Sequence, residues 1–191
     1  MSLFPMFLKL EGRRCLVVGA GTVAEAKIES LLATEAAVRV VAPHATPKVR
    51  EWARQGRIEW QAREYGVGDL LGVFLVIAAT NSPALHDEIY AEARRRGVLC
   101  NAVDEPERCD FYFPAVVRRG ELQIAISTGG LSPALAQRLR KDLEHQFGPE
   151  WEQWLAKLGQ TREELLSIPM PPEQRKRILH QYASLDPETT R

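Results

Sequence analysis

The sequence lacks the features of a disulfide-stabilised secreted protein, a membrane protein or a nucleic-acid-binding protein. Its three cysteines include no C-x-x-C pair, which is typical of a reduced protein rather than one held together by disulfides. No apolar run reaches the length of a membrane-spanning helix. Lysine plus arginine and aspartate plus glutamate number 25 each, so the overall charge predicts no nucleic-acid partner.

From the first residues of the sequence we expect no secretion signal. Residues 1–14 are apolar, but they contain no basic n-region and no small-residue cleavage site, and Pro5 and Lys9 interrupt them. Cys15 and Cys100 lie in or beside apolar, strand-like runs, where a thiol behaves as a small hydrophobic group. We therefore expect a protein that acts in the cytoplasm without contacting a membrane.

A regular alternation of buried strands and helices is present, and it predicts an α/β fold. Ser82 and Pro83 suit the N-cap and first position of a helix, and Gly97 suits a helix end. Apolar strands separated by helices are typical of a Rossmann-like, doubly wound parallel sheet. The expected strands cover 14–20, 37–43, 57–61, 72–80 and 98–103, and the expected helices cover 21–33, 46–56 and 84–97.

The pattern changes after Asp104. Residues 111–128 form two strand-like runs joined by "RRGE", which predicts a β-hairpin. A helix over 134–147 begins at the cap residue Ser132, and helical, polar segments follow from Pro149. The expected architecture is a parallel sheet followed by a hairpin and a helical C-terminal part.

The turn "VVGAGTVAEAK" carries Gly19, Gly21 and Ala24 in G-x-G-x-x-A spacing between a strand and a helix. The first glycine permits a tight turn, the second lets a pyrophosphate approach the backbone, and the small third residue lets helix and strand pack closely. A glycine-rich turn can also simply close a strand. The order strand, turn, helix, strand favours dinucleotide binding over that alternative.

One part of the dinucleotide fingerprint is absent. The second strand should end near an acidic residue that binds the adenine ribose, but Pro43 and His44 stand there. Backbone groups could still hold the ribose, and Lys48 and Arg50 follow closely enough to bind a 2′-phosphate. The fingerprint alone leaves both NAD and NADP open.

Three further sites along the chain each suit a structural and a functional role. Thr80 ends the fourth strand at the edge where cofactors bind in open α/β sheets, and it also suits a helix cap. Thr128, Gly129 and Gly130 suit either an anion cradle or an ordinary turn before a helix. Asp104 follows the fifth strand and suits either catalysis or capping of the turn "DEPER".

Taken together, several motifs are similar to one known family. They run in order from about residue 1 to about residue 147: "FPMFLKLEGRRCLVVGAGTVAEAK", "VVAP", "VIAATN", "CNAVDEPERCDFYFPAVV" and "ISTGGLSPALAQRLR". They resemble the precorrin-2 dehydrogenase family, which includes the dehydrogenase and ferrochelatase part of siroheme synthase. The family also lacks the ribose-binding acid, so that gap does not count against NAD.

The resemblance implies an enzyme that converts the tetrapyrrole precorrin-2 to sirohydrochlorin with NAD⁺, and some members also insert Fe²⁺. It implies a homodimer with an NAD-binding domain over 1–112, a dimerisation region over 113–147 and a helical region over 148–191. It places catalysis at Asp104. The residues expected to bind the cofactor are Gly19, Gly21, Thr22, Val23, Pro43, His44 and Thr80, and those expected to bind the substrate are Thr128, Gly129 and Gly130.

Regulation, metal insertion and the class of function stay open at this point. Thr128 stands where several bifunctional relatives carry serine, which keeps binding plausible but leaves any regulation there in doubt. The histidines His86, His145 and His180 are scattered and form no cluster with metal-ligand spacing, so the metal ligands are unknown. The alternatives are a non-enzymatic NAD sensor or a tetrapyrrole-binding module, and neither of them needs both the nucleotide turn and Asp104.

Overall fold

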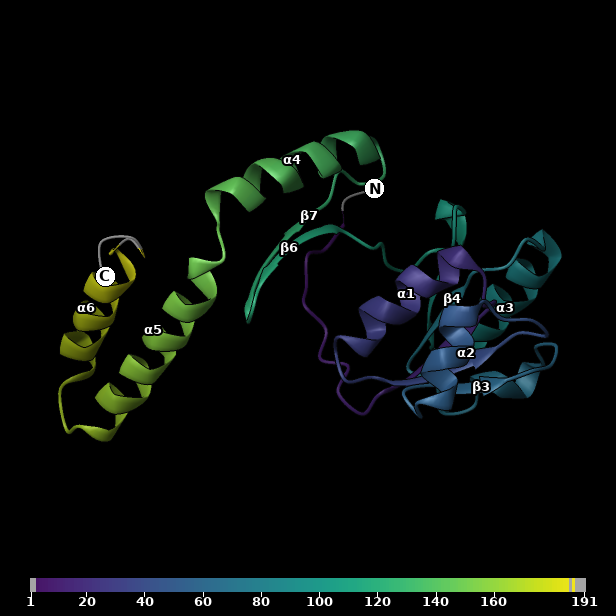
Figure 1. Ribbon diagram of the computed structural model, residues 1–191, viewed down its shortest axis with the longest axis horizontal. Coiled ribbons are helices and arrows are strands. Elements are labelled where there is room, and N and C mark those ends of the chain that lie inside the picture. Colours follow the sequence, from purple (N-terminus) through teal and green to yellow (C-terminus); the bar gives the residue numbers. More distant parts are fainter. Residues whose placement is uncertain (1–2, 186, 188–191) are drawn as a thin grey trace. The chain divides into compact units, whose positions relative to one another are not determined.

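The computed structural model describes residues 3–185 and 187. Its contacts divide the chain into two compact units, one formed by Phe4–Tyr112 and the other by Phe113 and the residues after it, together with Leu3. Figure 1 shows their elements in chain order.

The first unit is built on a five-stranded, wholly parallel sheet with the strand order β3-β2-β1-β4-β5. The chain runs from β1 outward to β3 on one side and then returns beside β1 to form β4 and β5. This reversal of direction makes the carboxyl ends of β1 and β4 the place where an open α/β sheet binds its ligand. The strands are β1 (Arg14–Val18), β2 (Ala37–Val41), β3 (Glu59–Gln61), β4 (Leu75–Ala78) and β5 (Leu99–Ala102).

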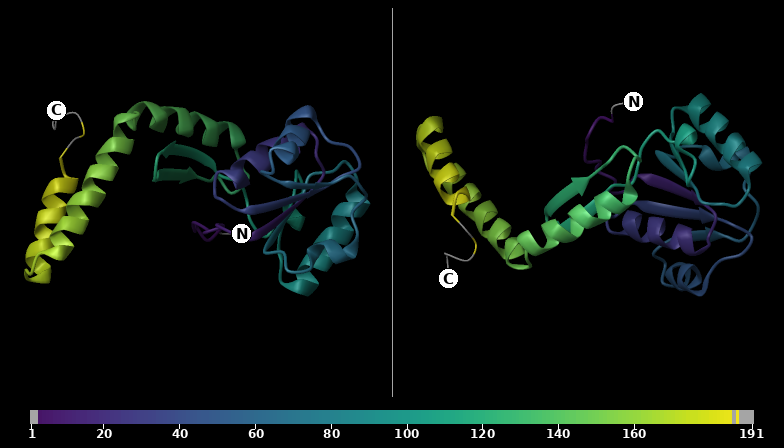
Figure 2. Two further views of the ribbon diagram at one scale, coloured as in Figure 1. Left: turned by 60° about the horizontal axis from the view of Figure 1, so that its bottom comes forward. Right: turned by 90° about the horizontal axis from the view of Figure 1, so that it is seen from above.

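Helices cover both faces of this sheet, so the doubly wound fold predicted from the sequence is confirmed. Figure 2 shows α1 and α2 on one face and α3 on the other. Ile89 and Ala93 of α3 pack with Leu16 and Val18 of β1 in one apolar cluster. The bounds are α1 (Thr22–Leu32), α2 (Pro47–Arg54) and α3 (Pro83–Arg96), with short 3-10 helices η1 (Val67–Leu70) and η2 (Pro106–Arg108).

The ends of α3 follow directly from the residues that bound it. Ser82 Oγ accepts a hydrogen bond from the Leu85 N–H at 3.3 Å, and Pro83 occupies the first turn. Gly97 ends the helix in the left-handed region with φ 67°. A residue without a Cβ adopts this conformation most easily, so the predicted cap and stop are both confirmed.

The second unit contains the predicted hairpin and helices. β6 (Ala115–Arg119) and β7 (Leu122–Ile126) form a two-stranded antiparallel sheet, and α4 (Pro133–Gln146) contacts both strands. The hairpin buries Val117 on its covered face. Two longer segments follow as α5 (Glu150–Ser167) and α6 (Pro172–Ala183).

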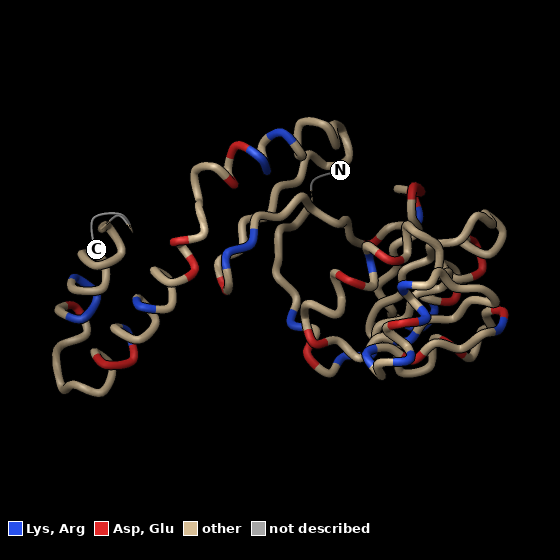
Figure 3. Tube along the Cα trace, viewed as in Figure 1, with Lys and Arg blue, Asp and Glu red and all other residues tan. Residues whose placement is uncertain are grey.

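The helices of the described residues carry charge along their lengths. Figure 3 shows basic and acidic residues interspersed on α4, α5 and α6. Within residues 3–185 and 187, no helix combines the length and the apolar character needed to cross a bilayer.

Candidate functional site

The glycine turn after β1 is pressed against the end of β4. Gly19 has φ 107°, and a Cβ placed on it would lie 2.1 Å from the carbonyl oxygen of Ala79. The backbone therefore leaves no room for any side chain at this position. This close approach brings the turn and the end of β4 together at the carboxyl edge of the sheet.

Gly21, in contrast to Gly19, faces open space, because a Cβ placed on it would have no atom within 4 Å. It is the N-cap of α1, and no side chain caps this helix end, whereas Thr46, Ser82 and Ser132 cap the starts of α2, α3 and α4. The uncapped amides and the helix dipole favour an anion. A dinucleotide pyrophosphate fits these residues.

The residues around Gly21 divide between the open side and the core. Thr22 and Val23 are exposed beside the open turn, where the pyrophosphate is expected. Ala24 is fully buried, because it faces the sheet at the first turn of α1. The small side chain at this position lets helix and strand approach closely, as the G-x-G-x-x-A spacing predicts.

Pro43 and His44 are both exposed just after β2. Two nearby cations have partners within the protein. Lys48 Nζ lies 3.2 Å from Glu29 Oε2, and Arg50 Nε donates to the Ala45 carbonyl oxygen at 2.9 Å. The exposed Lys48–Glu29 pair and the single Arg50 Nε contact do not discriminate between NAD and NADP.

Thr80 follows β4 and lies beside the glycine turn, since its methyl carbon is 3.4 Å from a Cβ placed on Gly19. Its hydroxyl accepts the Ser82 N–H at 3.3 Å just before α3. The capping role considered from the sequence is therefore present. The same residue stands at the carboxyl edge of the sheet, beside the turn where the cofactor is expected.

Asp104 is exposed in the turn that follows β5, and its φ is 62°. Backbone carbonyls already receive the amides of three residues in this turn. Glu105 N–H donates to Ala102, Arg108 N–H to Glu105 and Cys109 N–H to Pro106, at 3.2, 2.9 and 3.3 Å. Those amides do not depend on the Asp104 carboxylate as a cap. The carboxylate is thus presented to solvent at the carboxyl edge of β5.

Lys27 also lies near Asp104, although no sequence motif pointed to it. Lys27 lies on α1, and partial burial lowers the pKa of its ammonium group, while attraction to Asp104 and Cys109 opposes that lowering of the pKa. Burial also raises the pKa of the Cys109 thiol. Lys27 therefore adds a positive charge near the Asp104 carboxylate. Lys27 lies in the second turn of the helix that follows the glycines.

The contacts of His86 with residues near the site were also not predicted from the sequence. The sequence allowed a surface or a core position, and the side chain proves to be buried. It lies between Thr80 and Glu105, the residue after Asp104. This contact joins residues that are far apart in the sequence, so no local motif predicts it.

Thr128, Gly129 and Gly130 lie in the second unit, between β7 and α4. The glycines have φ of 62° and 83°, in the region that favours glycine. Thr128 Oγ1 accepts the Ser132 N–H at 3.2 Å, and Ser127 Oγ accepts the Gly129 N–H at 3.1 Å. Two backbone amides at this turn are thus bonded to hydroxyl groups of the turn itself, as expected for an ordinary turn before a helix.

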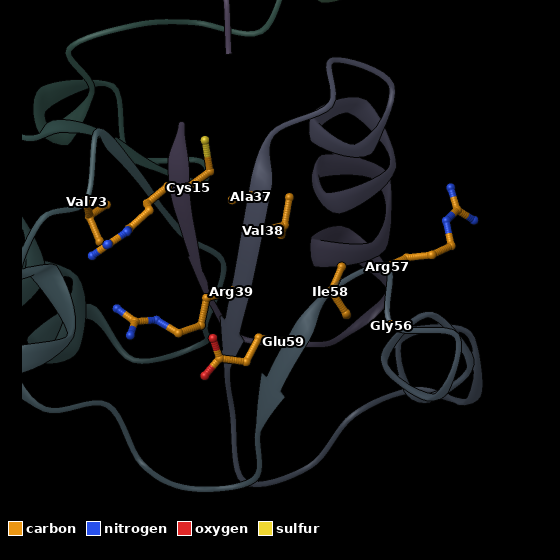
Figure 4. Close-up of a pocket in the computed structure, with 10 residues that line it drawn as sticks. Cys15, Ala37, Val38, Arg39, Gly56, Arg57, Ile58, Glu59 and Val73 are labelled. Atoms are coloured by element: carbon orange, nitrogen blue, oxygen red, sulfur yellow. The ribbon is translucent and has the colours of Figure 1, made fainter. Parts of the chain in front are cut away.

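A depression of about 370 Å³ lies elsewhere on the first unit. It opens at the amino ends of β1, β2 and β3, the edge opposite the glycine turn. Figure 4 shows that Arg57 points away from Arg39, so these two side chains do not converge on one anion. Its lining residues are Arg14, Cys15, Ala37, Val38, Arg39, Gly56, Arg57, Ile58, Glu59 and Val73.

Comparisons with protein families match both units. Residues 6–115 match the family described as putative NAD(P)-binding, and residues 119–146 match the sirohaem biosynthesis protein central family. The first match covers more than half of the chain. The described residues contain no group of three or more histidine, cysteine, aspartate or glutamate side chains placed to hold a metal ion.

Individual proteins agree with these families. Siroheme synthase 1 of Aeromonas hydrophila is 37% identical over 169 residues, which cover 88% of this chain and 36% of that protein. Siroheme synthase of Nitrosococcus oceani is 42% identical over 144 residues, or 75% of this chain and 31% of that protein. The chain thus spans about a third of the length of these curated relatives.

A solved structure gives a match over nearly the full length. SirC, a precorrin-2 dehydrogenase, is 30% identical with a TM-score of 0.82, and the match covers 94% of this chain and 88% of SirC. The parallel sheet, the hairpin and the helical part are therefore shared with SirC. This chain belongs to the NAD(P)-binding family of siroheme biosynthesis, with SirC precorrin-2 dehydrogenase among its relatives.

Proposed function

We propose that this chain oxidises precorrin-2 to sirohydrochlorin with NAD⁺ as the hydride acceptor. The observation that carries this proposal is one edge of the parallel sheet. There the uncapped α1 N-terminus at Gly21, the end of β4 at Thr80 and the exposed Asp104 carboxylate follow neighbouring strands. A nucleotide turn beside an acid–base group suits a dehydrogenase.

The binding roles follow from the position of each residue. Gly21, Thr22 and Val23 would hold the pyrophosphate by backbone amides at the start of α1. Pro43 and His44 would lie beside the adenosine. Gly19 would act indirectly, because its lack of a side chain lets the turn approach β4. Bound NAD⁺ would supply the hydride-accepting chemistry that no amino-acid side chain provides.

Asp104 would carry the proton chemistry. Loss of a hydride leaves a positive charge on the precorrin-2 macrocycle, and a proton must also leave before the uncharged macrocycle of sirohydrochlorin forms. The Asp104 carboxylate would stabilise the positive charge and accept this proton. The products are then sirohydrochlorin, NADH and one proton. Because Asp104 is exposed, it can release that proton directly to water.

The second unit would bind the substrate and form the dimer interface. The turn of Thr128, Gly129 and Gly130 would contact anionic groups of the tetrapyrrole, and residues 113–147 would form the interface of a homodimer. Both strands of the β6–β7 hairpin have one edge without a partner strand in the described residues. An isolated two-stranded sheet is only marginally stable, which supports its burial between subunits.

We place the reaction in the cytoplasm. All three cysteines are free thiols, with Cys15 and Cys100 buried in the first unit. Reduced thiols suit a reducing compartment. Ferrochelatase activity would be additional to the oxidation, with Fe²⁺ as a substrate and with the tetrapyrrole supplying its ligands.

One anaerobic assay tests the proposed function. The purified chain is mixed with precorrin-2 and NAD⁺, and NADH is followed by its near-ultraviolet absorbance together with the sirohydrochlorin spectrum. We expect NADH and sirohydrochlorin to form in equal amounts. NAD⁺ binding without any NADH would instead favour a sensor, and tetrapyrrole binding without NADH would favour a sequestering module. Adding Fe²⁺ or Co²⁺ in a second arm reports metal insertion.

A further inference from the structure

Asp104 has a backbone conformation that residues with a side chain seldom adopt. Its φ of 62° lies in the left-handed region. Aspartate tolerates this region better than most residues, but the conformation persists only where surrounding contacts determine it. The contacts that orient this turn therefore decide where the Asp104 carboxylate lies.

Backbone contacts account for only part of this orientation. The ladder between β5 and β4 ends with the Val103 N–H, which donates to the Ala78 carbonyl oxygen at 2.9 Å. Within the turn, Cys109 Sγ lies 3.1 Å from the Ala102 carbonyl oxygen and 3.3 Å from that of Glu105. The far end of the turn is closed onto β5, because the Asp110 N–H donates to the Cys100 carbonyl oxygen at 2.8 Å and Asp110 Oδ2 accepts the Cys100 N–H at 2.9 Å. None of these contacts connects the residues after Val103 to β4.

Glu105 provides that connection through side chains. Its Oε1 lies 3.0 Å from His86 Nδ1, and His86 Nε2 accepts the Thr80 N–H at 3.4 Å. Its Oε2 accepts from Arg108 Nη1 at 2.6 Å, and Arg108 Nε donates to Asp87 Oδ1 at 2.7 Å. Both oxygens of the Glu105 carboxylate are thus held, one by α3 and one by η2.

The hydrogen bonds assign the proton on the imidazole. A backbone nitrogen can only donate, so His86 Nε2 must accept from Thr80, and the ring hydrogen lies on Nδ1, facing Glu105. The side chain of His86 is only 4% exposed, so protein groups rather than bulk water satisfy it. The buried ring joins the end of β4 to the residue that follows Asp104.

A proton relay would be one use for such a chain of polar groups. The exposed Asp104 carboxylate, however, exchanges protons with water directly and needs no buried path. A fixed carboxylate beside the cofactor, by contrast, needs accurate placement, since small displacements of reacting groups reduce rates strongly. The geometry therefore suits orientation rather than proton transfer.

We propose that Glu105, held by His86 and Arg108, is a positioning residue that sets the Asp104 turn relative to Thr80 at the cofactor edge. This inference rests on the proposed dehydrogenase function and on Asp104 as its base. It assigns no contact between Glu105 and the substrate. The role of Glu105 is exerted entirely through the turn that it anchors.

The test compares Glu105→Ala, Glu105→Gln and Glu107→Ala in the intact chain. Glu107 is exposed in the same 3-10 helix and serves as the matched control. We expect Glu105→Ala to lower kcat by about 10- to 100-fold, as misplacement of a reacting group does, with the Kd for NAD⁺ within about twofold. Glu105→Gln keeps an oxygen that can accept the His86 Nδ1–H but presents an amide NH2 to Arg108, so it should recover only part of the lost kcat.

Two results would overturn the positioning role. One is a kcat for Glu105→Ala equal to that of Glu107→Ala, and the other is an equal loss in Glu105→Ala and Glu105→Gln. If Glu105→Ala does not fold, as judged by its thermal unfolding, Arg108→Gln removes the Arg108 contacts with Glu105 Oε2 and Asp87 but leaves Oε1 with His86, and it should lower kcat without changing NAD⁺ affinity. A normal kcat in Arg108→Gln would then refute the role.

The same experiment separates this inference from the proposed function. If the wild-type chain and Glu107→Ala both produce no NADH from precorrin-2, the dehydrogenase assignment fails and the positioning role fails with it. If both are active and only the Glu105 variants behave unlike the expectation, the dehydrogenase assignment stands and the positioning role alone is refuted.

Discussion

Gly19 and Gly21 belong to one motif, but different physical constraints act on them. At Gly19 the backbone of β4 excludes any side chain, whereas Gly21 faces open space at the start of α1. Substitution at Gly19 should therefore disturb the fold. Substitution at Gly21 should disturb the ligand, because only an incoming phosphate would occupy that space.

Gly21→Asp tests the cofactor assignment at the scale of one residue. The new carboxylate would stand where the pyrophosphate belongs, and repulsion between like charges should weaken NAD⁺ binding by roughly 100-fold or more. Titration of NAD⁺ into the folded variant measures this loss. Gly21→Ala is the control, because it adds a methyl group without charge and should retain more affinity. Equal affinity in Gly21→Asp and wild type would remove the dinucleotide assignment.

Single residues also show the limit of sequence reasoning about the site. The glycine spacing and the aspartate after a strand were recognisable because each lies within one short motif. Lys27, His86 and Glu105 were missed as members of the site, because their relation to Asp104 or Thr80 arises only when α1, α3 and the turn after β5 meet. The roles assigned to the site residues stay predictions, which variants of Gly21, Glu105 and Asp104 test.

At the scale of elements, the short helix η1 is held by one buried carboxylate. The Asp69 carboxylate accepts hydrogen bonds from Arg63 Nη2 and Nη1, at 2.6 and 2.8 Å, and from the Gly66 N–H at 2.9 Å. The Asp69 carbonyl oxygen accepts from Arg39 Nη2 at 2.5 Å, which links η1 to β2. The hydrogen bond from Arg63 is the main cause that lowers the pKa of the Asp69 carboxyl, and the Gly66 amide lowers this pKa further.

Asp69→Asn should therefore destabilise the protein in a pH-dependent way. At neutral pH we expect the free energy of unfolding to fall by about 1–2 kcal/mol, since Arg63 is half-exposed and the amide keeps one acceptor. Because the pKa of Asp69 is lower in the folded state, the contribution is complete above about pH 4 and is lost as the pH falls below it. Denaturant unfolding of both proteins at neutral and acidic pH measures this. A difference that grows toward acid would contradict the account.

The main strands and helices of the first unit were predictable because each is bounded by local chemistry, whereas the 3-10 helices η1 and η2 were not predicted. Continuous apolar runs marked the buried strands, and Ser82 and Gly97 marked the ends of α3. β3 is shorter than its expected range, since only Glu59–Gln61 pair with β2 at the edge of the sheet. Strand length at an edge depends on the pairing partner, which the sequence of the strand itself does not contain.

At the scale of the whole molecule, the proposed assembly depends on the second unit. Leu131 is 92% exposed in the turn before α4, within residues 113–147. An apolar side chain so exposed beside unpaired strand edges suits an interface with another subunit. The sequence predicted the hairpin from its apolar runs, but its use as an interface involves a second chain and stays a prediction.

Leu131→Glu tests that interface. We expect the wild-type chain to sediment as a dimer at micromolar concentration and the variant to shift toward monomer, because a buried, unpaired charge would oppose association. Leu166→Glu is the matched control, since Leu166 is exposed on α5 outside residues 113–147. A wild-type monomer under these conditions would refute the proposed dimer, and identical sedimentation of all three proteins as dimers would remove Leu131 from the interface.

The central claim is that the Asp104 carboxylate drives NAD-dependent oxidation of precorrin-2, and one measurement tests it most directly. Anaerobic NADH formation is compared between the wild-type chain and Asp104→Asn, which tolerates the left-handed backbone and removes only the ionised group. We predict that the variant still binds NAD⁺ but loses ~10²–10⁴-fold in turnover, as expected for a lost acid–base group. Near-normal turnover in the folded, NAD-binding variant would contradict the claim and leave Asp104 as a residue of the turn.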